Sequence, residues 1–382
     1  HPYRMKLLEH QVKYARGYPD KAFLVHEGGT GKTVCASVWL RDGRDADAVV
    51  VCPKRIVRKW KGSLKDWQTK ATVLTKDEFK KTPLKRWSAV VFDESDEFAA
   101  PLFCGKGSQL ADHAYNLVRE YPDMPVALLT ATPIRSTPWN LHTQLCLLGK
   151  YVEWKEWRAR FFELKYPSEL PYLVRPSWVE KYYWREDIRK ELEKHADIVL
   201  LKDIVDDVPA VEEIEIPIKT LIPKDALDFH DVHRAEQVNK LPEIKAIGKE
   251  YRKVIVVAYY TEQVEAIAKE LKKERQTFMV HGKVKKQEEI LEAAAQSDEC
   301  YLVIQASLGA GFDGDSFSDV VFASMAFAVR DFAQMKYRVR RIHNLHPVRY
   351  HFLLGGRCDR QVLKNVKAGK NFVPSEWDPY DA

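Results

Sequence analysis

Short runs of apolar residues, separated by longer mixed stretches, are the main pattern along the chain. Runs this short and this rich in β-branched residues predict fully buried strands of parallel sheets. Residues 264–271, between two of the runs, have the spacing of an amphipathic helix. Strands that alternate with helices in both halves of the chain predict an α/β fold with two lobes. The predicted strands are residues 23–25, 49–52, 89–92 and 126–129 in the first half, and 254–257, 278–280, 301–304, 320–323 and 350–354 in the second.

The middle of the chain differs from both halves. Residues 151–184 are rich in aromatic side chains, and residues 203–223 carry prolines among acidic and β-branched residues. The aromatic side chains could stack on bases, but dense aromatic segments more often pack an accessory subdomain, which is the favoured interpretation. We expect a first lobe over 1–150, a mostly helical aromatic-rich appendage over 151–205, and a second lobe over 206–382 that opens with a linker at about 206–223.

Composition narrows the class of protein only a little. With 382 residues, 45% hydrophobic and 30% charged, the chain has the make-up of a globular protein of about two domains. The net charge of +6 weakly favours a polyanionic partner. The six cysteines are scattered without a C-x-x-C pair, which argues against a zinc site or a disulfide framework and fits a reducing compartment.

The sequence gives no indication of a membrane segment. No apolar run reaches the roughly 18–20 residues that a span requires. The first residues do not resemble a signal peptide, and the chain does not begin with Met. We therefore expect a cytoplasmic or otherwise intracellular protein without a membrane partner, with the nucleus and a virus-infected host cell both left open.

A glycine-rich loop lies between the first predicted strand and a predicted helix that begins at Lys32. The glycines let backbone N–H groups approach a phosphate, and the helix N-terminus adds partial positive charge. Lys32 can then reach the β- and γ-phosphates of ATP, and the Thr33 hydroxyl can ligate Mg²⁺. A tight turn with a chance lysine is the less favoured alternative. The residues expected to bind nucleotide here are Gly28, Gly29, Thr30, Gly31, Lys32 and Thr33.

Two acidic residues follow a later predicted strand. Asp93 and Glu94 come directly after the run at 89–92, at the carboxyl end where ligands bind in open α/β sheets. Asp93 is suited to holding Mg²⁺ through water, and Glu94 to orienting or deprotonating the attacking water. The alternative, a solvated acidic turn, is disfavoured by the apolar strand before it and the phosphate loop upstream.

These motifs, in this order, resemble the superfamily 2 helicases and, within them, the Swi/Snf-like DNA translocases, over nearly the whole chain. Residues 7–11 look like the adenine-reading motif of that family, with Gln11 in the glutamine position and His10 in place of the usual aromatic neighbour. Residues 49–54, followed by Trp60 and Trp67, are similar to the first nucleic-acid-binding motif.

Further motifs continue the resemblance. Residues 93–96 stand for the acidic box, and residues 129–134 match the motif that links the ATP and nucleic-acid sites. Residues 305–313 resemble the fifth motif, which implies that Gly311 and Asp313 lie near the ribose of the nucleotide.

The closing motif, residues 334–344, is the most specific. It keeps the Gln, the two Arg and the Ile of the Swi/Snf-like form and departs only after Ile342. Arg338 and Arg341 are three residues apart, so on a helix they would share a face. Their guanidinium groups could clamp the γ-phosphate as charge develops in the transition state.

The resemblance implies two RecA-like lobes and a nucleic-acid-stimulated ATPase that uses ATP and Mg²⁺. The leading hypothesis is a DNA translocase that moves on and remodels duplex or branched DNA, with RNA not excluded, in repair or recombination. A strand-separating RNA or DNA helicase and an ATP-gated nucleic-acid-binding switch are the alternatives. The chain length fits a compact viral or bacterial motor. The candidate contacts to the nucleic-acid backbone are Lys54, Arg55, Arg135 and Ser307.

Overall fold

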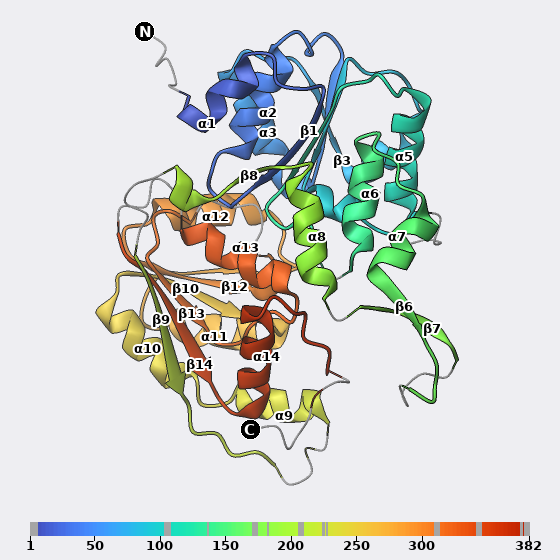
Figure 1. Cartoon of the computed structure of the whole chain (residues 1–382). Helices are drawn as coiled ribbons and strands as arrows, with labels where there is room; N and C mark the ends of the chain where they lie inside the picture. Colours follow the sequence, from blue (N-terminus) through green and yellow to red (C-terminus); the bar gives the residue numbers. More distant parts are fainter. Residues whose placement is uncertain are drawn as a thin grey trace. The chain divides into compact units, whose positions relative to one another are not determined.

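Two parallel sheets organise the chain (Figure 1). The computed structural model describes residues 7–102, 108–135, 137–169, 175–181, 183–204, 210–223, 226, 228–308, 314–340, 346–374 and 377. The chain divides into two compact units, His1–Ile204 and Val205–Ala382, and each contains one six-stranded sheet. The predicted fold class, α/β with two parallel-sheet lobes, is confirmed.

The first unit is a parallel sheet with helices on both faces. Its strands are β1 (Lys21–His26), β2 (Ala48–Cys52), β3 (Thr72–Thr75), β4 (Ala89–Asp93), β5 (Val126–Thr130) and β8 (Asp197–Val199). Its helices are α1 (Glu9–Val12), α2 (Lys32–Arg41), α3 (Val57–Asp66), α4 (Lys76–Lys81), α5 (Gln109–Glu120), α6 (Trp139–Leu147), α7 (Trp154–Phe161) and α8 (Trp184–Glu193). The strand order is β3-β2-β4-β5-β1-β8, so β5 lies between β4 and β1.

The core of the first unit follows from the alternation of side chains along each strand. Leu24 and its counterparts on the other strands pack under α2 and α3, together with the buried Trp39 and Trp60. Phe23 and its counterparts face the opposite side, which α5 and α6 cover (Figure 1). Because both faces are covered, each central strand is apolar throughout, which is why the runs were readable in the sequence.

The second unit repeats this plan. Its strands are β9 (Val211–Pro217), β10 (Lys253–Ala258), β11 (Thr277–Val280), β12 (Cys300–Gln305), β13 (Asp319–Phe322) and β14 (Val348–Leu354), in the order β11-β12-β10-β13-β14-β9. Its helices are α9 (Phe229–Glu236), α10 (Leu241–Glu250), α11 (Thr261–Leu271), α12 (Gln287–Gln296), α13 (Val329–Val339) and α14 (Arg357–Lys367). Helices α10 and α11 pack on one face, and α9, α12, α13 and α14 on the other.

Every apolar run predicted as a strand forms one, and residues 264–271 lie within helix α11 as predicted. The strands that the sequence did not reveal lie at sheet edges. Strand β3 is short and partly exposed, and β9 falls in the expected linker, where it pairs with β14 and alternates exposed with half-buried residues. Edge strands need no continuous apolar run, because one side or one face remains in solvent.

The aromatic-rich segment is mixed rather than mostly helical. Helices α7 and α8 agree with the expectation, but β6 (Phe162–Lys165) and β7 (Ser177–Glu180) form an antiparallel pair, and β8 joins the first sheet. Trp157, Phe161 and Trp184 are buried in the core of the first unit, which confirms the packing interpretation for these side chains. Trp154 and Trp178 are exposed and enclose the guanidinium of Arg158, 4.3 and 4.2 Å from the ring centroids.

Among the described residues, no helix combines the length and the apolar character that crossing a membrane would require.

Candidate nucleotide site

The glycine-rich loop joins the carboxyl end of β1 to the N-terminus of α2. Gly29 and Gly31 have left-handed backbone angles, with φ of 88° and 87°, which glycine adopts without steric cost. Gly31 also caps helix α2, and a Cβ there would lie 2.4 Å from Nε2 of Gln11. The loop therefore requires glycine at this position. It leads directly into the first turn of a helix, whose N–H groups have no intrahelical partner and form a ready anion site.

Lys32 folds back over this loop. Its Nζ donates to the carbonyl oxygens of His26 and Glu27, at 2.7 and 3.3 Å. The Thr30 hydroxyl donates to the same Glu27 carbonyl at 2.8 Å, which closes the loop into a tight turn. The ammonium is thus held beside the loop backbone, where a phosphate bound by the N–H groups would meet it.

Asp93 ends strand β4 and is almost fully buried. Its Oδ2 accepts a hydrogen bond from the indole Nε1 of Trp60 at 2.7 Å, and its Oδ1 accepts one from the backbone N–H of Glu94 at 2.9 Å. Burial raises the pKa of this carboxyl, while the Trp60 bond and the positive charge of Lys32 lower it. The charge of Lys32 therefore acts on Asp93. Lys32 follows β1 and Asp93 ends β4, and β5 lies between these two strands in the sheet.

The donor set around Asp93 suits a hard divalent cation. Each carboxylate oxygen has a lone pair left after its hydrogen bond, and Thr33 offers a hydroxyl at the start of α2. A buried carboxylate whose ionised form is disfavoured by burial would be stabilised by Mg²⁺. Thr33 and Asp93 are accordingly the residues that could hold that ion.

Glu94 has a left-handed backbone conformation, with φ 51° and ψ 57°, at the turn into the 3₁₀ helix η3 (Ser95–Phe98). Such a conformation is uncommon for a residue with a Cβ and costs on the order of 1–3 kcal/mol. Strain of this kind is concentrated at functional sites, where the surrounding structure holds it in place. Here the fixed neighbours are Asp93 before it and the buried Ser95 after it.

The acidic turn is tied to the loop after β5. The buried Asp96 carboxylate accepts hydrogen bonds from the Thr130 hydroxyl at 3.0 Å and from Nε of Arg135 at 2.6 Å. Gln144 on α6 makes a second bridge, since its Oε1 accepts from Ser95 and its Nε2 donates to the Pro133 carbonyl. Residues 93–96 and 129–134 therefore form one hydrogen-bonded unit.

Gln11 reaches the phosphate loop from α1. Its Oε1 accepts from the backbone N–H of Leu8 at 3.0 Å, and its Nε2 lies 3.5 Å from the Thr30 carbonyl. The buried side chain thus anchors α1 against the loop. Its assignment to adenine recognition stays a prediction.

The proposed backbone contacts fall into two groups. Lys54 and Arg55 begin the 3₁₀ helix η2 (Lys54–Ile56) after β2, and Ser307 lies in η6 (Ala306–Leu308) after β12; Lys54 and Ser307 are exposed. Arg135 differs, because its guanidinium is engaged with the buried Asp96. Its expected role on nucleic acid therefore competes with an internal ion pair.

Two tryptophans and the closing motif complete the account of the predicted residues. Trp60 and Trp67 are both buried, so neither presents a face on which a base could stack. Helix α13 carries the half-buried Arg338 and ends at Val339, and Arg340 is extended, with φ −79° and ψ 96°. Arg341 lies outside the described residues, as do Gly311 and Asp313, so their expected roles stay predictions.

The sequence did not reveal the contacts that support the site from behind. Trp60 and Asp96 lie in motifs that the sequence analysis named, but their hydrogen bonds, to Asp93 for Trp60 and with Thr130 and Arg135 for Asp96, depend on the fold. Gln144, which accepts a hydrogen bond from Ser95, was missed, because no spacing in the sequence marks it.

Comparison with known proteins concerns the second unit and the fold. Residues 236–343 match the family model described as the helicase conserved C-terminal domain. No curated protein sequence matches the chain.

Among solved structures, S. cerevisiae Dbp5 bound to RNA and ADP BeF3 superposes with a TM-score of 0.59 at 12% identity, covering 98% of this chain and 91% of that one. The Mycobacterium smegmatis helicase Lhr bound to ssDNA and AMP-PNP gives 0.56 at 14% identity, covering 94% of this chain and 48% of that one. At these identities the likeness establishes the fold, and together with the matched domain it supports the resemblance to superfamily 2 helicases.

Proposed function

We propose that the chain is a nucleic-acid-stimulated ATPase that couples hydrolysis of ATP to movement on DNA. The observation that carries the proposal is the pairing of the phosphate loop with Asp93, whose carboxylate is held by Trp60 and influenced by the charge of Lys32. Residues 236–343, in the second lobe, match a helicase C-terminal domain. This match supports a helicase-type ATPase as the protein to which the phosphate loop and Asp93 belong.

The residues of the first lobe have separate tasks in this proposal. Backbone N–H groups of residues 28–31 and the ammonium of Lys32 bind the phosphates. Thr33 and Asp93 hold Mg²⁺, which neutralises charge on the phosphate oxygens when bound. Glu94 orients the attacking water and accepts its proton, from the strained turn that directly follows Asp93.

The second lobe supplies the remaining groups. Arg338 and Arg341 stabilise the charge that develops on the γ-phosphate, and residues of the fifth motif, Gly311 and Asp313, contact the ribose. Removal of such an arginine costs on the order of 10³–10⁵ in rate in other phosphate-transfer systems. ATP would favour the lobe arrangement that brings these groups to the phosphates, because a ligand shifts an equilibrium by its differential affinity for the two states.

Movement requires that each lobe also hold the nucleic-acid backbone. Lys54, Arg55 and Ser307 follow the carboxyl ends of their strands, one set in each lobe. Contacts of this kind are independent of sequence and weaken as salt rises. We propose duplex or branched DNA as the track, on the Swi/Snf-like pattern of the closing motif. The second candidate, a strand-separating RNA or DNA helicase, is favoured by the likeness to Dbp5, which was solved with RNA, and to Lhr, solved with ssDNA.

Phosphate release should be measured with duplex, forked and single-stranded DNA and with RNA, at two salt concentrations. We expect duplex or forked DNA to stimulate turnover most, and the stimulation to fall as salt is raised. Lys32→Ala is the control that removes nucleotide turnover without touching the proposed track contacts. Equal stimulation by RNA would reject the DNA translocase in favour of the second candidate, and no stimulation by any nucleic acid would reject both.

A further inference from the structure

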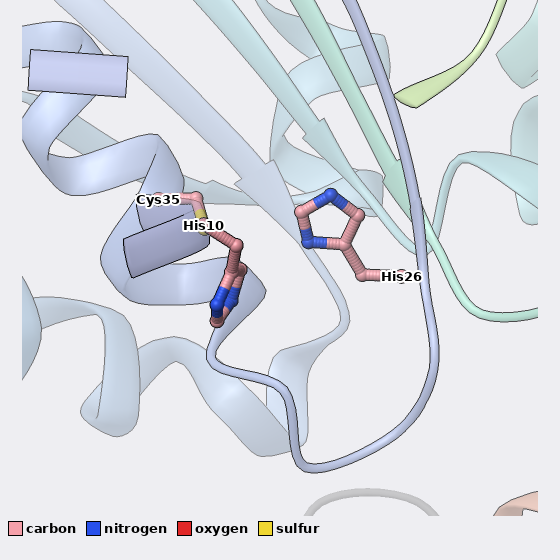
Figure 2. Close-up of side chains that lie close together, drawn as sticks. All are labelled: His10, His26 and Cys35. Atoms are coloured by element: carbon pink, nitrogen blue, oxygen red, sulfur yellow. The ribbon is translucent and has the colours of Figure 1, made fainter. Parts of the chain in front are cut away.

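Three potential metal ligands meet beside the phosphate loop, and nothing in the proposed ATPase cycle uses them together. His10 comes from α1, His26 from the end of β1 and Cys35 from α2, and their side chains converge in Figure 2. Each offers one ligand atom, and the three atoms lie within 4.8 Å of one another. Across the described part of the chain, no other three His, Cys, Asp or Glu side chains are grouped in this way.

One nitrogen of each histidine is buried without a hydrogen-bond partner. These atoms are Nδ1 of His10 and Nδ1 of His26. An unpaired buried polar atom costs on the order of 1–3 kcal/mol, and such atoms are rare in native proteins. Both belong to side chains that offer ligand atoms within 4.8 Å of each other and of Cys35, and a shared bound cation would explain both.

The other nitrogen of each ring fixes the tautomer. Nε2 of His10 lies 2.9 Å from the Thr30 carbonyl oxygen, and Nε2 of His26 lies 2.9 Å from Oδ2 of Asp197. A carbonyl and a carboxylate only accept, so the proton of each ring lies on Nε2. Each Nδ1 therefore carries a lone pair. Metal-bound histidines typically donate their second N–H to a carboxylate or a backbone carbonyl in this way.

Asp197 is itself held in place for this role. Lys13 donates to its Oδ1 at 2.6 Å, and the Tyr14 hydroxyl donates to Oδ2. Burial would raise the pKa of Asp197, but the hydrogen bonds from His26, Lys13 and Tyr14 bring it well below the ordinary value, so the carboxylate is ionised at neutral pH.

The donor set, two imidazoles and the buried thiol of Cys35, indicates which ion fits. A thiol among the ligands favours an ion with a strong preference for thiolate. Mg²⁺ and Ca²⁺ prefer oxygen ligands, whereas Zn²⁺ combines imidazole with thiolate.

We propose that Nδ1 of His10, Nδ1 of His26 and Sγ of Cys35 form a binding site for a zinc-class divalent ion. Zinc lies about 2.0–2.3 Å from such ligands, so in a tetrahedral site the ligand atoms are roughly 3.5 Å apart. The three atoms must therefore approach by about 1 Å, and His10, the least buried of the three and part of a four-residue helix, can supply that movement.

The scattered cysteines had argued against a zinc site because no C-x-x-C pair occurs. That argument concerns ligands supplied by one local segment. Here the ligands come from three elements that the parallel sheet brings together, and only one of them is cysteine. The ion would tie α1 to β1 and α2, on either side of the phosphate loop, and His10 would connect it to the Thr30 carbonyl.

The test is a titration of the full chain, stripped with a chelator, with Co²⁺ in the absence of ATP and Mg²⁺. We expect one equivalent to bind, with a thiolate-to-cobalt charge-transfer band, and Zn²⁺ to displace it. A wild-type chain that binds cobalt without that band, or binds none, would overturn the proposal whatever the variants show.

The variants locate the site. Cys35→Ser should abolish the charge-transfer band and weaken Zn²⁺ binding by roughly 100-fold or more, beyond the 10–100-fold that loss of an outer partner such as Asp197 costs. Cys300→Ser is the matched control, since Cys300 is equally buried but lies in the second unit. If Cys35→Ser does not fold, as judged by circular dichroism, His10→Ala replaces it, because the partly exposed ring can be removed without opening a sealed cavity. Unchanged Zn²⁺ binding in the folded variant refutes the site.

Discussion

Replacing Trp60 with Phe tests the central contact of the candidate site. The change keeps an aromatic ring in the core under α3 but removes the indole N–H that Asp93 accepts at 2.7 Å. A hydrogen bond to a charged group contributes about 1.5–3 kcal/mol, and the smaller ring also leaves a cavity. The cost of the lost hydrogen bond depends on whether Asp93 is ionised. The cost of the cavity does not.

The pH dependence follows from linkage. Burial raises the folded-state pKa of Asp93 above the unfolded value of about 3.9, so the folded chain holds a proton more tightly. Stability therefore falls as the pH rises above the unfolded pKa, and the full cost of burying the carboxylate is reached above the folded pKa. The Trp60 bond offsets part of that cost. Trp60→Phe raises the folded pKa further, so it should destabilise the first unit by about 1.5–3 kcal/mol more above that pKa than below it.

The measurement is urea unfolding of the full chain at several pH values from the unfolded pKa of about 3.9 up to about 9, reading the transition that reports the first unit. Trp39→Phe is the matched control. Trp39 is also buried, but its Nε1 donates to the Pro19 carbonyl, which does not titrate, so its cost should be the same at every pH. A Trp60→Phe cost that is equally flat across pH would refute the argument that Trp60 stabilises an ionised Asp93.

Further predictions concern turnover and acid stability. Lys32→Ala and Glu94→Gln should each reduce phosphate release by at least about 100-fold while leaving the circular dichroism spectrum unchanged, and appreciable ATPase in either would exclude the site assignment. Arg341→Ala should lose turnover but retain binding of a fluorescent nucleotide analogue; equal loss of both would rule out a transition-state role. Asp197 has a lowered pKa, so its contribution to stability is fully present above the unfolded pKa of about 3.9 and is lost as pH falls from that value through the lower folded pKa. Asp197→Asn should therefore flatten the acid limb of the unfolding profile, and an unchanged limb would contradict the network around His26.

The apolar pattern of the sequence predicts the central strands but not the strands at the sheet edges. The central strands β1, β4 and β5 are buried on both faces, so each had to be apolar throughout and could be read directly. Strand β9 has acidic residues on its exposed side and a proline at its end, and it was therefore read as a linker. Its pairing with β14 depends on a partner 137 residues away in sequence, as from Val211 to Val348, which no local pattern encodes.

The candidate site divides in the same way. The glycines of the phosphate loop and the Asp93-Glu94 pair were predictable, because a left-handed backbone and a carboxylate at a strand end leave marks on the local sequence. The partners of those residues were not. Trp60 reaches Asp93, and Gln144 joins the acidic turn to the loop after β5, only because the sheet places their helices beside it.

By itself, then, the sequence determined two α/β lobes, a glycine-rich loop between a strand and a helix, and an acidic pair at another strand end, because backbone geometry and two-sided burial restrict the residue types allowed at each position. The tertiary structure alone decided which side chains support that loop and that pair. It made Trp60 a hydrogen-bond donor to Asp93, ended helix α13 at Val339, and brought His10, His26 and Cys35 together. Side-chain contacts between elements depend on strand order and helix placement, and these are set by packing of the whole unit.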